Sequence, residues 1–278
     1  MSMRQSQLLS LVITAYTTER LSDIYELLES VKNQTYKNIE IIVIDNNSKD
    51  QTKKIAKKYT KKIYNKGSER STQKNSGAQI ANGDYLLFLD SDAQLTKNVI
   101  SECVELANQN FDMVIIPERH VGTGFWTKAK ALERQCFLND DSVEAPWFFK
   151  KTSLLAVNGY DEKMFAGEDW DLFERMKKKE FRYTRNASFI NHQLGHLHFW
   201  KMIKKKHYYG KNLCIFINQN HKAFLKKIPF FRPAYLKNWK LLIKHPFLTI
   251  GFILLKLGET FFVFLGIINY KFNQIKLK

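Results

Sequence analysis

The chain has 278 residues, of which 44% are hydrophobic, and a net charge of +17 at pH 7. This length suits one large domain, or one domain with an appendage. Its three widely spaced cysteines, Cys103, Cys136 and Cys214, argue against a disulfide framework or a CxxC zinc site and fit a reducing compartment. Residues 181–258 contain fifteen Lys or Arg and no Asp or Glu, and such a one-signed surface attracts nucleic acid, anionic lipid or phosphorylated substrates.

The first half of the chain alternates strand and helix patterns. We expect strands at 8–14, 40–44 and 85–89, and helices at 21–33, 52–62 and 71–82. This order predicts a parallel sheet with helices on its faces. The carboxyl ends of the strands then place Tyr16, Asp45 and Asp92 along one edge, where a doubly wound fold binds its ligand.

The middle of the chain is less regular. Strands are expected at 113–117 and 147–149, a flexible loop at 122–124, and helices at 126–138 and 168–179. The last of these helices begins with acidic residues and ends in a run of Lys, which is the polarity that the helix dipole favours.

The segment 246–270 is strongly apolar and contains only two charges, Lys256 and Glu259. It is long enough to cross a bilayer, but charges near the centre count against a span. They lie three residues apart and can pair on one face, and a basic flank precedes them at Lys237, Lys240, Lys244 and His245. We favour a helix or helical hairpin in the membrane interface. A true span, or a helix packed on the protein's own core, remains an alternative.

The most informative stretch is the strand pattern 85–89 and the Asp90-Ser91-Asp92 that follows it. A buried strand that ends in two carboxylates one residue apart brings both to the sheet's edge. Such oxygen ligands suit Mg²⁺ or Mn²⁺, which proteins usually hold with one or two carboxylates plus substrate phosphates. The expected partner is therefore a diphosphate-containing nucleotide, although a polar turn that caps the next helix would show the same pattern.

Five segments in order resemble family 2 glycosyltransferases of the GT-A fold, over residues 8–210: 11–21, 40–50, 68–84, 90–92 and 158–175. The resemblance implies a Rossmann-like, mostly parallel α/β sheet in residues 1–220, with a nucleotide-binding half at 1–110 and an acceptor-binding half at 111–220. Residues 221–278 would form a helical, membrane-associating appendage. The resemblance also implies an inverting transferase that uses Mn²⁺ or Mg²⁺ and moves a sugar from a UDP- or GDP-sugar to a saccharide or lipid-linked acceptor.

The resemblance also assigns roles to individual residues. Asp169 matches the catalytic base, and Glu168 would orient the acceptor or the base, although acids at a helix start also serve simply as caps. The metal ligands would be Asp92, Asp90 and His192, with His196 and His198 as rivals for the histidine. The acceptor would contact Trp147, Gly159 and Trp170. Binding of the nucleotide sugar would fall to Thr14, Tyr16, Glu19, Asp45, Ser48, Arg70, Asn75, Asp90, Lys205 and Lys206, of which the last two are also explained as a solvated charge run.

Two other classes of protein stay open. A non-catalytic module that binds nucleic acid or anionic membrane would use the aromatic residues interleaved with the Lys residues at 199–239, but no RNP, zinc-finger or OB pattern is present and nucleic acid is not the expected partner. A nucleotidyltransferase would need a Gly-rich phosphate loop after the first strand, and that loop is missing from this sequence. No long apolar segment precedes residue 8, so we expect a cytoplasmic protein, peripheral to the cytoplasmic face of a membrane and anchored by 246–270.

Overall fold

The computed structural model describes residues 7–16, 20–67, 69–141, 143–164, 167–207, 210 and 233–276. The chain forms two compact units. The first unit comprises Met1–Glu118, Ala145–Glu162 and Asp169–Gln193, and the second comprises Arg119–Glu144, Lys163–Glu168 and Leu194–Lys278. The expected boundary between the transferase domain and the tail, at residue 220, lies outside the described residues. It stays a prediction, as does the expected boundary at 110 between the two halves of that domain.

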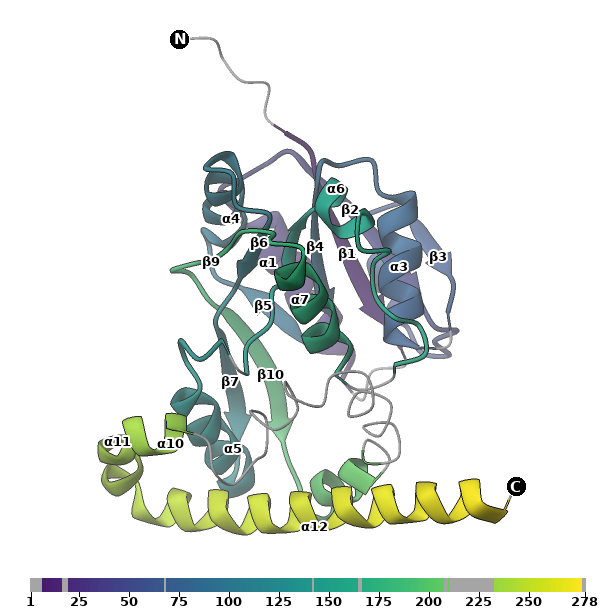
Figure 1. Ribbon diagram of the computed structural model, residues 1–278. Helices are drawn as coiled ribbons and strands as arrows, with labels where there is room; N and C mark the ends of the chain where they lie inside the picture. The colour runs from purple at the N-terminus through teal and green to yellow at the C-terminus, as the bar shows by residue number, and fades with distance from the viewer. Residues whose placement is uncertain are drawn as a thin grey trace. The chain divides into compact units, whose positions relative to one another are not determined.

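A seven-stranded sheet with the order β3-β2-β1-β4-β8-β6-β9 forms the centre of the first unit (Figure 1). Strand β1 pairs in parallel with β2 and with β4, while β8 pairs antiparallel with β4 and β6. The predicted mostly parallel α/β sheet is therefore confirmed. The strands are β1 (Leu9–Ala15), β2 (Ile39–Asp45), β3 (Ile63–Asn65), β4 (Tyr85–Asp90), β6 (Met113–Ile115), β8 (Phe148–Lys150) and β9 (Tyr183–Arg185).

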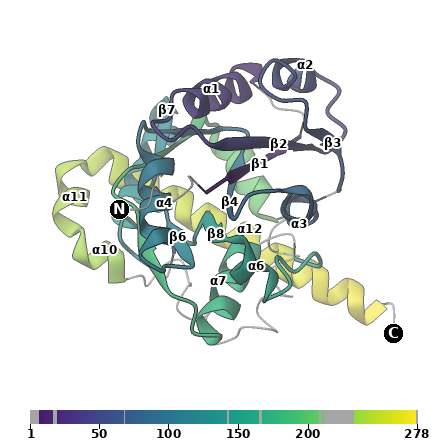
Figure 2. The same cartoon turned by 90° about the horizontal axis from the view of Figure 1, so that it is seen from above.

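Helices cover both faces of this sheet. Successive side chains of a strand point to opposite faces, so Leu11 and Ile13 of β1 join one core cluster and Val12 joins the other. Helices α1 (Leu21–Lys32) and α4 (Val99–Asn108) complete the first cluster, and α3 (Arg70–Ile80), α6 (Lys151–Leu155) and α7 (Glu168–Lys178) complete the second. Figure 2 shows α1 on one side of β1 and β2 and α3 on the other. The predicted helix 52–62 is shorter than expected, since α2 covers only Thr52–Ala56.

A second, three-stranded sheet has the order β5-β10-β7, formed by β5 (Ala93–Leu95), β10 (Ile190–His196) and β7 (Glu118–Thr123). The expected flexible loop at 122–124 is wrong, because Gly122 and Thr123 end strand β7. Glycine serves here for close approach rather than for mobility: a Cβ on Gly122 would lie 2.3 Å from the carbonyl oxygen of Gly195 in β10.

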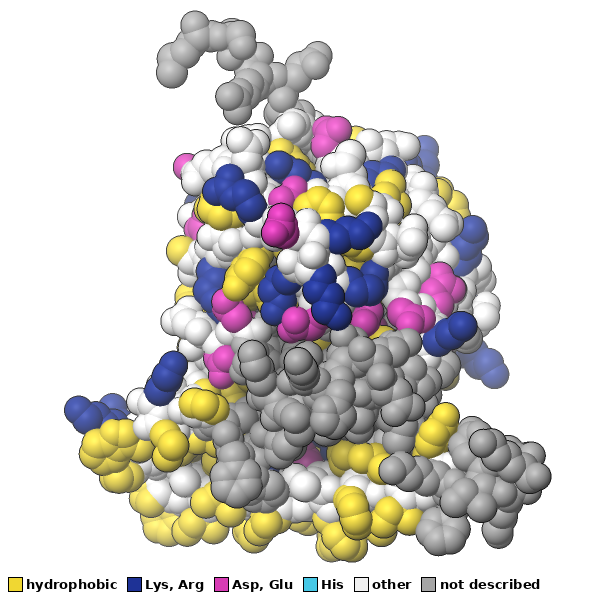
Figure 3. Space-filling view, viewed as in Figure 1, with side chains coloured by type: hydrophobic (Ala, Val, Ile, Leu, Met, Phe, Trp, Pro, Cys, Tyr) yellow, Lys and Arg dark blue, Asp and Glu magenta, His cyan; other side chains and the backbone are white. Residues whose placement is uncertain are grey.

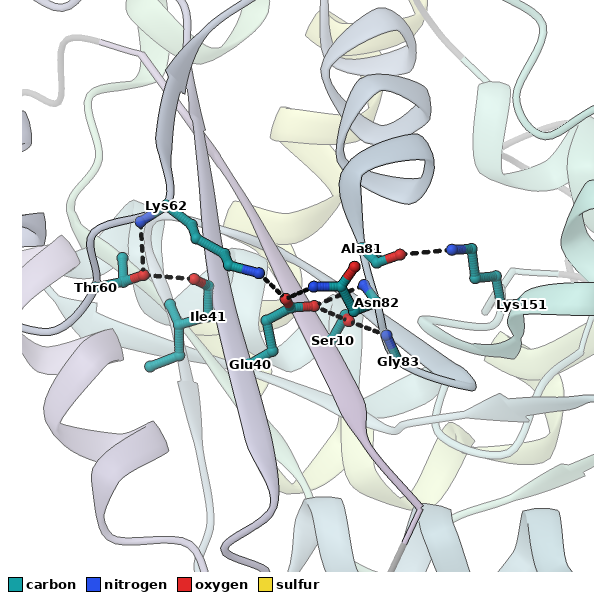
Figure 4. Close-up of polar contacts among 9 residues, drawn as sticks. All are labelled: Ser10, Glu40, Ile41, Thr60, Lys62, Ala81, Asn82, Gly83 and Lys151. Carbon is teal, nitrogen blue, oxygen red and sulfur yellow. Dashed lines mark hydrogen bonds and ion pairs between the residues drawn. The ribbon is translucent and has the colours of Figure 1, made fainter.

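The amino-terminal ends of three neighbouring strands are joined by one partly buried polar network (Figure 4). The Glu40 carboxylate at the start of β2 accepts hydrogen bonds from the Lys62 ammonium, the Ser10 hydroxyl and, at 2.9 Å each, the backbone and side-chain amides of Asn82. Ser10 Oγ in turn accepts the Gly83 backbone amide at 2.8 Å. Because Gly83 precedes β4, this network fixes where β1, β2 and β4 begin relative to one another.

Stability should depend on the charge of Glu40. Burial by itself raises the pKa of Glu40, but the hydrogen bonds from Lys62, Ser10 and Asn82 outweigh it and lower the pKa below its ordinary value of 4.5. The stabilisation by Glu40 is therefore complete above pH 4.5, and it is lost as the pH falls from there through the lowered pKa of the folded protein. We expect Glu40→Gln to lower the unfolding free energy by about 1–3 kcal/mol near neutral pH, and the difference from wild type in urea unfolding to shrink in acid. An equal difference at both pH values would contradict this role.

The second unit contains α5 (Phe125–Cys136), a helical segment at 199–207, and the helices α10 (Pro233–Lys237), α11 (Trp239–Lys244) and α12 (Pro246–Lys276). Phe252 and Leu255 of α12 pack with Ala129 of α5 in a core cluster that also includes Phe199. The apolar segment is therefore helical, as expected. Its part Pro246–Tyr270 is long and apolar enough to cross a membrane, by length and composition only, and one third of its most apolar window is buried within the protein.

Charged side chains join α12 to α5. Glu259 contacts Lys256 Nζ at 3.0 Å and Lys130 Nζ of α5 at 3.0 Å. Lys130 also pairs with Glu133 at 2.7 Å, and Lys256 pairs with Glu133 as well. The predicted pairing of Lys256 with Glu259 is confirmed. It belongs to a buried cluster in which the carboxylates of Glu133 and Glu259 pair with the ammonium groups of Lys130 and Lys256, and Lys206 Nζ lies 3.9 Å from Glu259.

Candidate active site

Asp90 ends strand β4 and is held by two neighbours from the first unit. Thr14, which lies opposite it in register on β1, donates its hydroxyl to Oδ1 at 2.8 Å, and Arg70 at the start of α3 contacts Oδ2 at 3.0 Å. Burial raises the pKa of Asp90, but Arg70, Lys74 and His192 together lower it well below its ordinary value. The structure thus brings Thr14, Arg70 and Asp90 together, and Asp90 is ionised.

Asp92 and His192 face each other across the pairing of β5 with β10. In this antiparallel pair His192 lies opposite Ala93, directly after the Asp-Ser-Asp turn, and its Nε2 lies 2.9 Å from Asp92 Oδ2. Its Nδ1 lies 3.7 Å from Glu118 Oε2. Burial lowers the pKa of His192, yet the two carboxylates raise it to about 10, so the imidazole carries a proton between them.

This group of side chains fits a divalent cation. Glu118 and His192 can bring donor atoms within 4.8 Å of each other, and Asp92 contacts the other ring nitrogen of His192. Carboxylate oxygens and imidazole nitrogens are ligands that Mn²⁺ or Mg²⁺ accepts. A cation here would supply the positive charge that the His192 proton now provides, with release of that proton. Asp90 is engaged by Thr14 and Arg70, so Asp92 is the acid of the pair that lies beside the histidine. Glu118 was not predicted, because a single acid after Pro117 gives no sequence signal.

A buried lysine contacts the predicted catalytic base. Lys74 Nζ on α3 lies 2.8 Å from Asp169 Oδ1 near the start of α7. The Lys74 side chain is 2% exposed and that of Asp169 is 37% exposed. The ammonium also lies 4.8 Å from the ring centroid of Tyr160 and 5.9 Å from that of Trp147. Because the same ammonium lowers the pKa of Asp90, the two predicted carboxylates share one neighbour.

Sequence reasoning missed Lys74. The available signal is its position on α3: Ser71, Lys74, Gly77 and Ala78 are buried and repeat at helical spacing, which places Lys74 on the face that packs against the sheet. A lysine on such a face needs a partner. The α3–β1 contact is close, since a Cβ on Gly77 would lie 2.2 Å from Val12.

The predicted acceptor loop is held by side chains from α3 and α7. Gly159 has φ +63°, and a Cβ there would lie 2.5 Å from Asn75 Oδ1, so only glycine fits without strain. Asn75 accepts the Tyr160 backbone amide and donates to the Tyr160 carbonyl, both at 2.9 Å. Arg175 donates to the carbonyls of Val157 and Gly159 at 2.7 Å. Asn75 therefore positions the loop, and its predicted contact with the donor stays a prediction.

Two buried polar atoms near the end of β2 lack a hydrogen-bond partner within the described residues. Asp45 is fully buried; its Oδ2 accepts the Ser48 backbone amide at 2.8 Å and lies 3.6 Å from Lys53 Nζ. Its Oδ1 and the Ser48 hydroxyl have no hydrogen-bond partner within the described residues. An unpaired buried acceptor is costly, and a ligand donor would relieve that cost. Tyr16, just after β1, is 63% exposed.

Five of the remaining predicted residues belong to the second unit. Glu19 lies outside the described residues. Trp170 lies on α7 and is partly buried. Glu168, His196, His198, Lys205 and Lys206 belong to the second unit, where Lys206 Nζ lies 3.9 Å from Glu259. Of the three candidate histidines, His192 is the one that contacts Asp92, and the roles of all these residues stay predictions.

The fold resembles that of solved structures, one of them a mannosyltransferase. Mannosyltransferase PcManGT from Pyrobaculum calidifontis, in complex with GDP-Man and Mn²⁺, superposes with a TM-score of 0.63 at 13% identity, over 96% of this chain and 88% of that one. S. aureus TarS 1-349 superposes with a TM-score of 0.57 at 15% identity, over 96% and 92%. At such identities the likeness concerns the fold alone. The architecture is that of the GT-A glycosyltransferases, as predicted.

The sequence comparison identifies the family. The family model described as glycosyl transferase family 2 matches residues 10–181, more than half of the chain. The chain therefore belongs to glycosyltransferase family 2, which favours the transferase prediction over a binding module or a nucleotidyltransferase.

Two curated relatives act on lipid-linked substrates, as their names state. GalNAc(5)-diNAcBac-PP-undecaprenol beta-1,3-glucosyltransferase of Campylobacter jejuni is 26% identical over 199 residues, covering 64% of this chain and 62% of the relative. UDP-Glc:alpha-D-GlcNAc-diphosphoundecaprenol beta-1,3-glucosyltransferase WfaP of Escherichia coli is 41% identical over 93 residues, covering 31% and 36%. The matches span less than two thirds of the length of either relative.

Replacement of Lys74 should affect turnover more than substrate binding. In Lys74→Met the Asp169 carboxylate loses the ammonium that fixes it, and misplacement of a reacting group by about 1 Å costs on the order of 100-fold in rate. We expect kcat to fall by that factor while KM for the donor changes several-fold at most. Lys177→Met is the matched control, because Lys177 also pairs with a carboxylate, Glu174 at 2.8 Å, and lies over the Phe173 ring at 4.5 Å. Equal kcat values in the two variants would refute the assignment.

Proposed function

We propose that this protein is a metal-dependent, inverting glycosyltransferase that moves a sugar from a nucleotide diphosphate sugar to a lipid-linked or other membrane-proximal saccharide acceptor. Its main support is the contact made by Lys74. That ammonium touches Asp169 at 2.8 Å and lowers the pKa of Asp90 at the end of β4. Asp169 is suited to an alcohol acceptor, and Asp90 belongs to the carboxylates suited to a cation and a diphosphate. Both therefore interact with the one buried ammonium of Lys74.

The donor nucleotide would bind along the carboxyl ends of β1, β2 and β4. The unpaired Asp45 Oδ1 and Ser48 hydroxyl offer an acceptor and a donor to the polar edge of a nucleobase. Arg70 and Asp90 lie where the ribose or the diphosphate would follow. A divalent cation held by Asp92, Asp90 and His192, with Glu118 beside the histidine, would neutralise the charge that grows on the leaving diphosphate.

The acceptor hydroxyl would approach Asp169. This carboxylate is partly exposed, and the Lys74 contact fixes one of its oxygens, which leaves the other free to take the hydroxyl proton as the new bond forms. Glu168 would orient the acceptor or the base, and Trp147, Gly159 and Trp170 would line the acceptor side. Lys205 and Lys206 would meet the donor's diphosphate.

The similar proteins support the proposed donor and acceptor classes. PcManGT was solved with GDP-Man and Mn²⁺ and S. aureus TarS 1-349 with UDP-GlcNAc, which favours a UDP- or GDP-sugar as donor. Both curated relatives are named as transferases to undecaprenol-linked glycans. A polyprenyl-diphosphate-linked saccharide is the corresponding acceptor here, used at the cytoplasmic face of an anionic membrane.

Two substitutions separate binding from chemistry. With Mn²⁺ and a panel of UDP- and GDP-sugars, at least one donor should raise the melting temperature of the wild-type protein. Asp169→Asn should keep that shift and lose transfer by roughly 10²- to 10⁴-fold, whereas Asp92→Asn should lose the shift that depends on Mn²⁺. Asp171→Asn on the same helix, where Asp171 pairs with Arg175 at 2.7 Å, serves as control and should retain more transfer than Asp169→Asn. Full transfer by Asp169→Asn, or no donor that shifts the wild type, would refute the proposal.

A further inference from the structure

The outward face of α12 carries an unbroken stripe of large apolar side chains. Six of them are between 46% and 78% exposed: Phe247, Ile250, Leu254, Leu257, Phe261 and Phe264. Their spacing alternates between three and four residues, which places them on one face of a helix. At 1.5 Å per residue the stripe is roughly 26 Å long. Figure 3 shows apolar side chains in a row along the lower edge of the view, where α11 and α12 run.

The opposite face of α12 is committed to the protein. Lys256 and Glu259 are 8% and 6% exposed and are neutralised by Lys130 and Glu133 of α5. Gly251 and Gly258 allow Phe125 and Ile203 to approach α12 within van der Waals contact. A helix that crossed a bilayer here would have to leave this cluster and take two charges into lipid, or carry α5 and its charges into lipid with it. Either is costly, because charged side chains at the centre of a bilayer are strongly disfavoured.

The neighbouring helices extend the surface with aromatic and basic groups. On α10 and α11, Leu236, Trp239 and Ile243 are 79%, 53% and 66% exposed. Lys237, Lys240 and Lys244 are exposed between them, and Lys240 Nζ lies 5.9 Å from the centroid of the Trp239 ring. Tryptophan and lysine side by side are typical of the level of the lipid headgroups, where lysines meet anionic phosphates.

A second copy of the chain fits this surface less well than a bilayer. A coiled-coil partner would cover one stripe and would be selected by charges that flank it. Between residues 246 and 264 the only charges are Lys256 and Glu259, and both point into the ion cluster. The exposed apolar surface also continues beyond the stripe onto α10 and α11.

We propose that α10, α11 and α12 form an in-plane binding surface for one leaflet of an anionic bilayer. The α12 stripe enters the acyl boundary, and Lys237, Lys240 and Lys244 contact headgroup phosphates. The ion cluster between α5 and α12 keeps the helix on the protein and prevents it from crossing. This inference deepens the proposed function, because it specifies how the enzyme would reach a lipid-linked acceptor, but it can fail independently of it.

Vesicle co-sedimentation of the full chain tests the surface. Leu257→Asp should weaken binding to phosphatidylcholine–phosphatidylglycerol vesicles by about tenfold or more, since the apolar burial of one leucine is lost. Leu155→Asp is the matched control, because Leu155 is 47% exposed, close to the 51% of Leu257, and lies in the first unit. It should bind as wild type does. The triple change of Lys237, Lys240 and Lys244 to Gln should remove roughly a hundredfold of the affinity that depends on phosphatidylglycerol.

Several results would overturn this inference. Equal binding by Leu257→Asp and Leu155→Asp would do so. A wild-type dimer in light scattering that becomes a monomer in Leu257→Asp would reassign the stripe to a protein interface. The mode of binding is tested with a cysteine added after Lys278: an impermeant maleimide should not label it in intact spheroplasts, and labelling would show that α12 crosses the membrane.

The same variants separate this inference from the proposed catalysis. The melting-temperature shift caused by the nucleotide sugar with Mn²⁺ should be unchanged in Leu257→Asp, because the stripe is not part of the donor site. Vesicle binding without any donor-induced shift would support the surface and count against the transferase. A donor-induced shift without vesicle binding would support the transferase and count against the membrane-binding surface.

Discussion

The buried ammonium of Lys74 is the interaction on which the candidate site depends. A lysine side chain that is only 2% exposed needs negative neighbours, and it has them in Asp169 from α7 and in the field of Asp90 from β4. Helix α3 can present this group to the carboxyl edge of the sheet because Gly77 lets it lie directly on β1. Two acids 79 positions apart in the sequence thereby interact with the same ammonium.

In the second unit, the long apolar helix α12 carries two charges near its centre. A 31-residue helix with an apolar middle would be read as a membrane span, yet its two central charges are each matched by an opposite charge on α5. This pairing makes burial of Lys256 and Glu259 against the protein tolerable, and it determines which face of α12 remains outside. The charged pair and the apolar stripe are thus two consequences of one sequence pattern.

The sequence predicted the parts of this structure that follow from local pattern. The β1, β2 and β4 strands, the helices α1, α3, α5 and α7, and the pairing of Lys256 with Glu259 all carry strong periodic signals. Short strands such as β5 and β9, with three residues each, were missed because tertiary pairing rather than propensity forms them. The same holds for Lys74 and Glu118, whose neighbours are distant in sequence, and for Gly122, which suggested a loop where close strand contact required glycine.

A crystal structure of the chain with Mn²⁺ and a bound nucleotide sugar tests the central claim most directly. The anomalous signal of manganese should lie at Asp92 and His192, with the diphosphate beside it and the Asp169 carboxylate facing the sugar's anomeric carbon from the opposite side. Manganese bound elsewhere on the protein, or an Asp169 side chain directed away from the occupied cleft, would contradict the account.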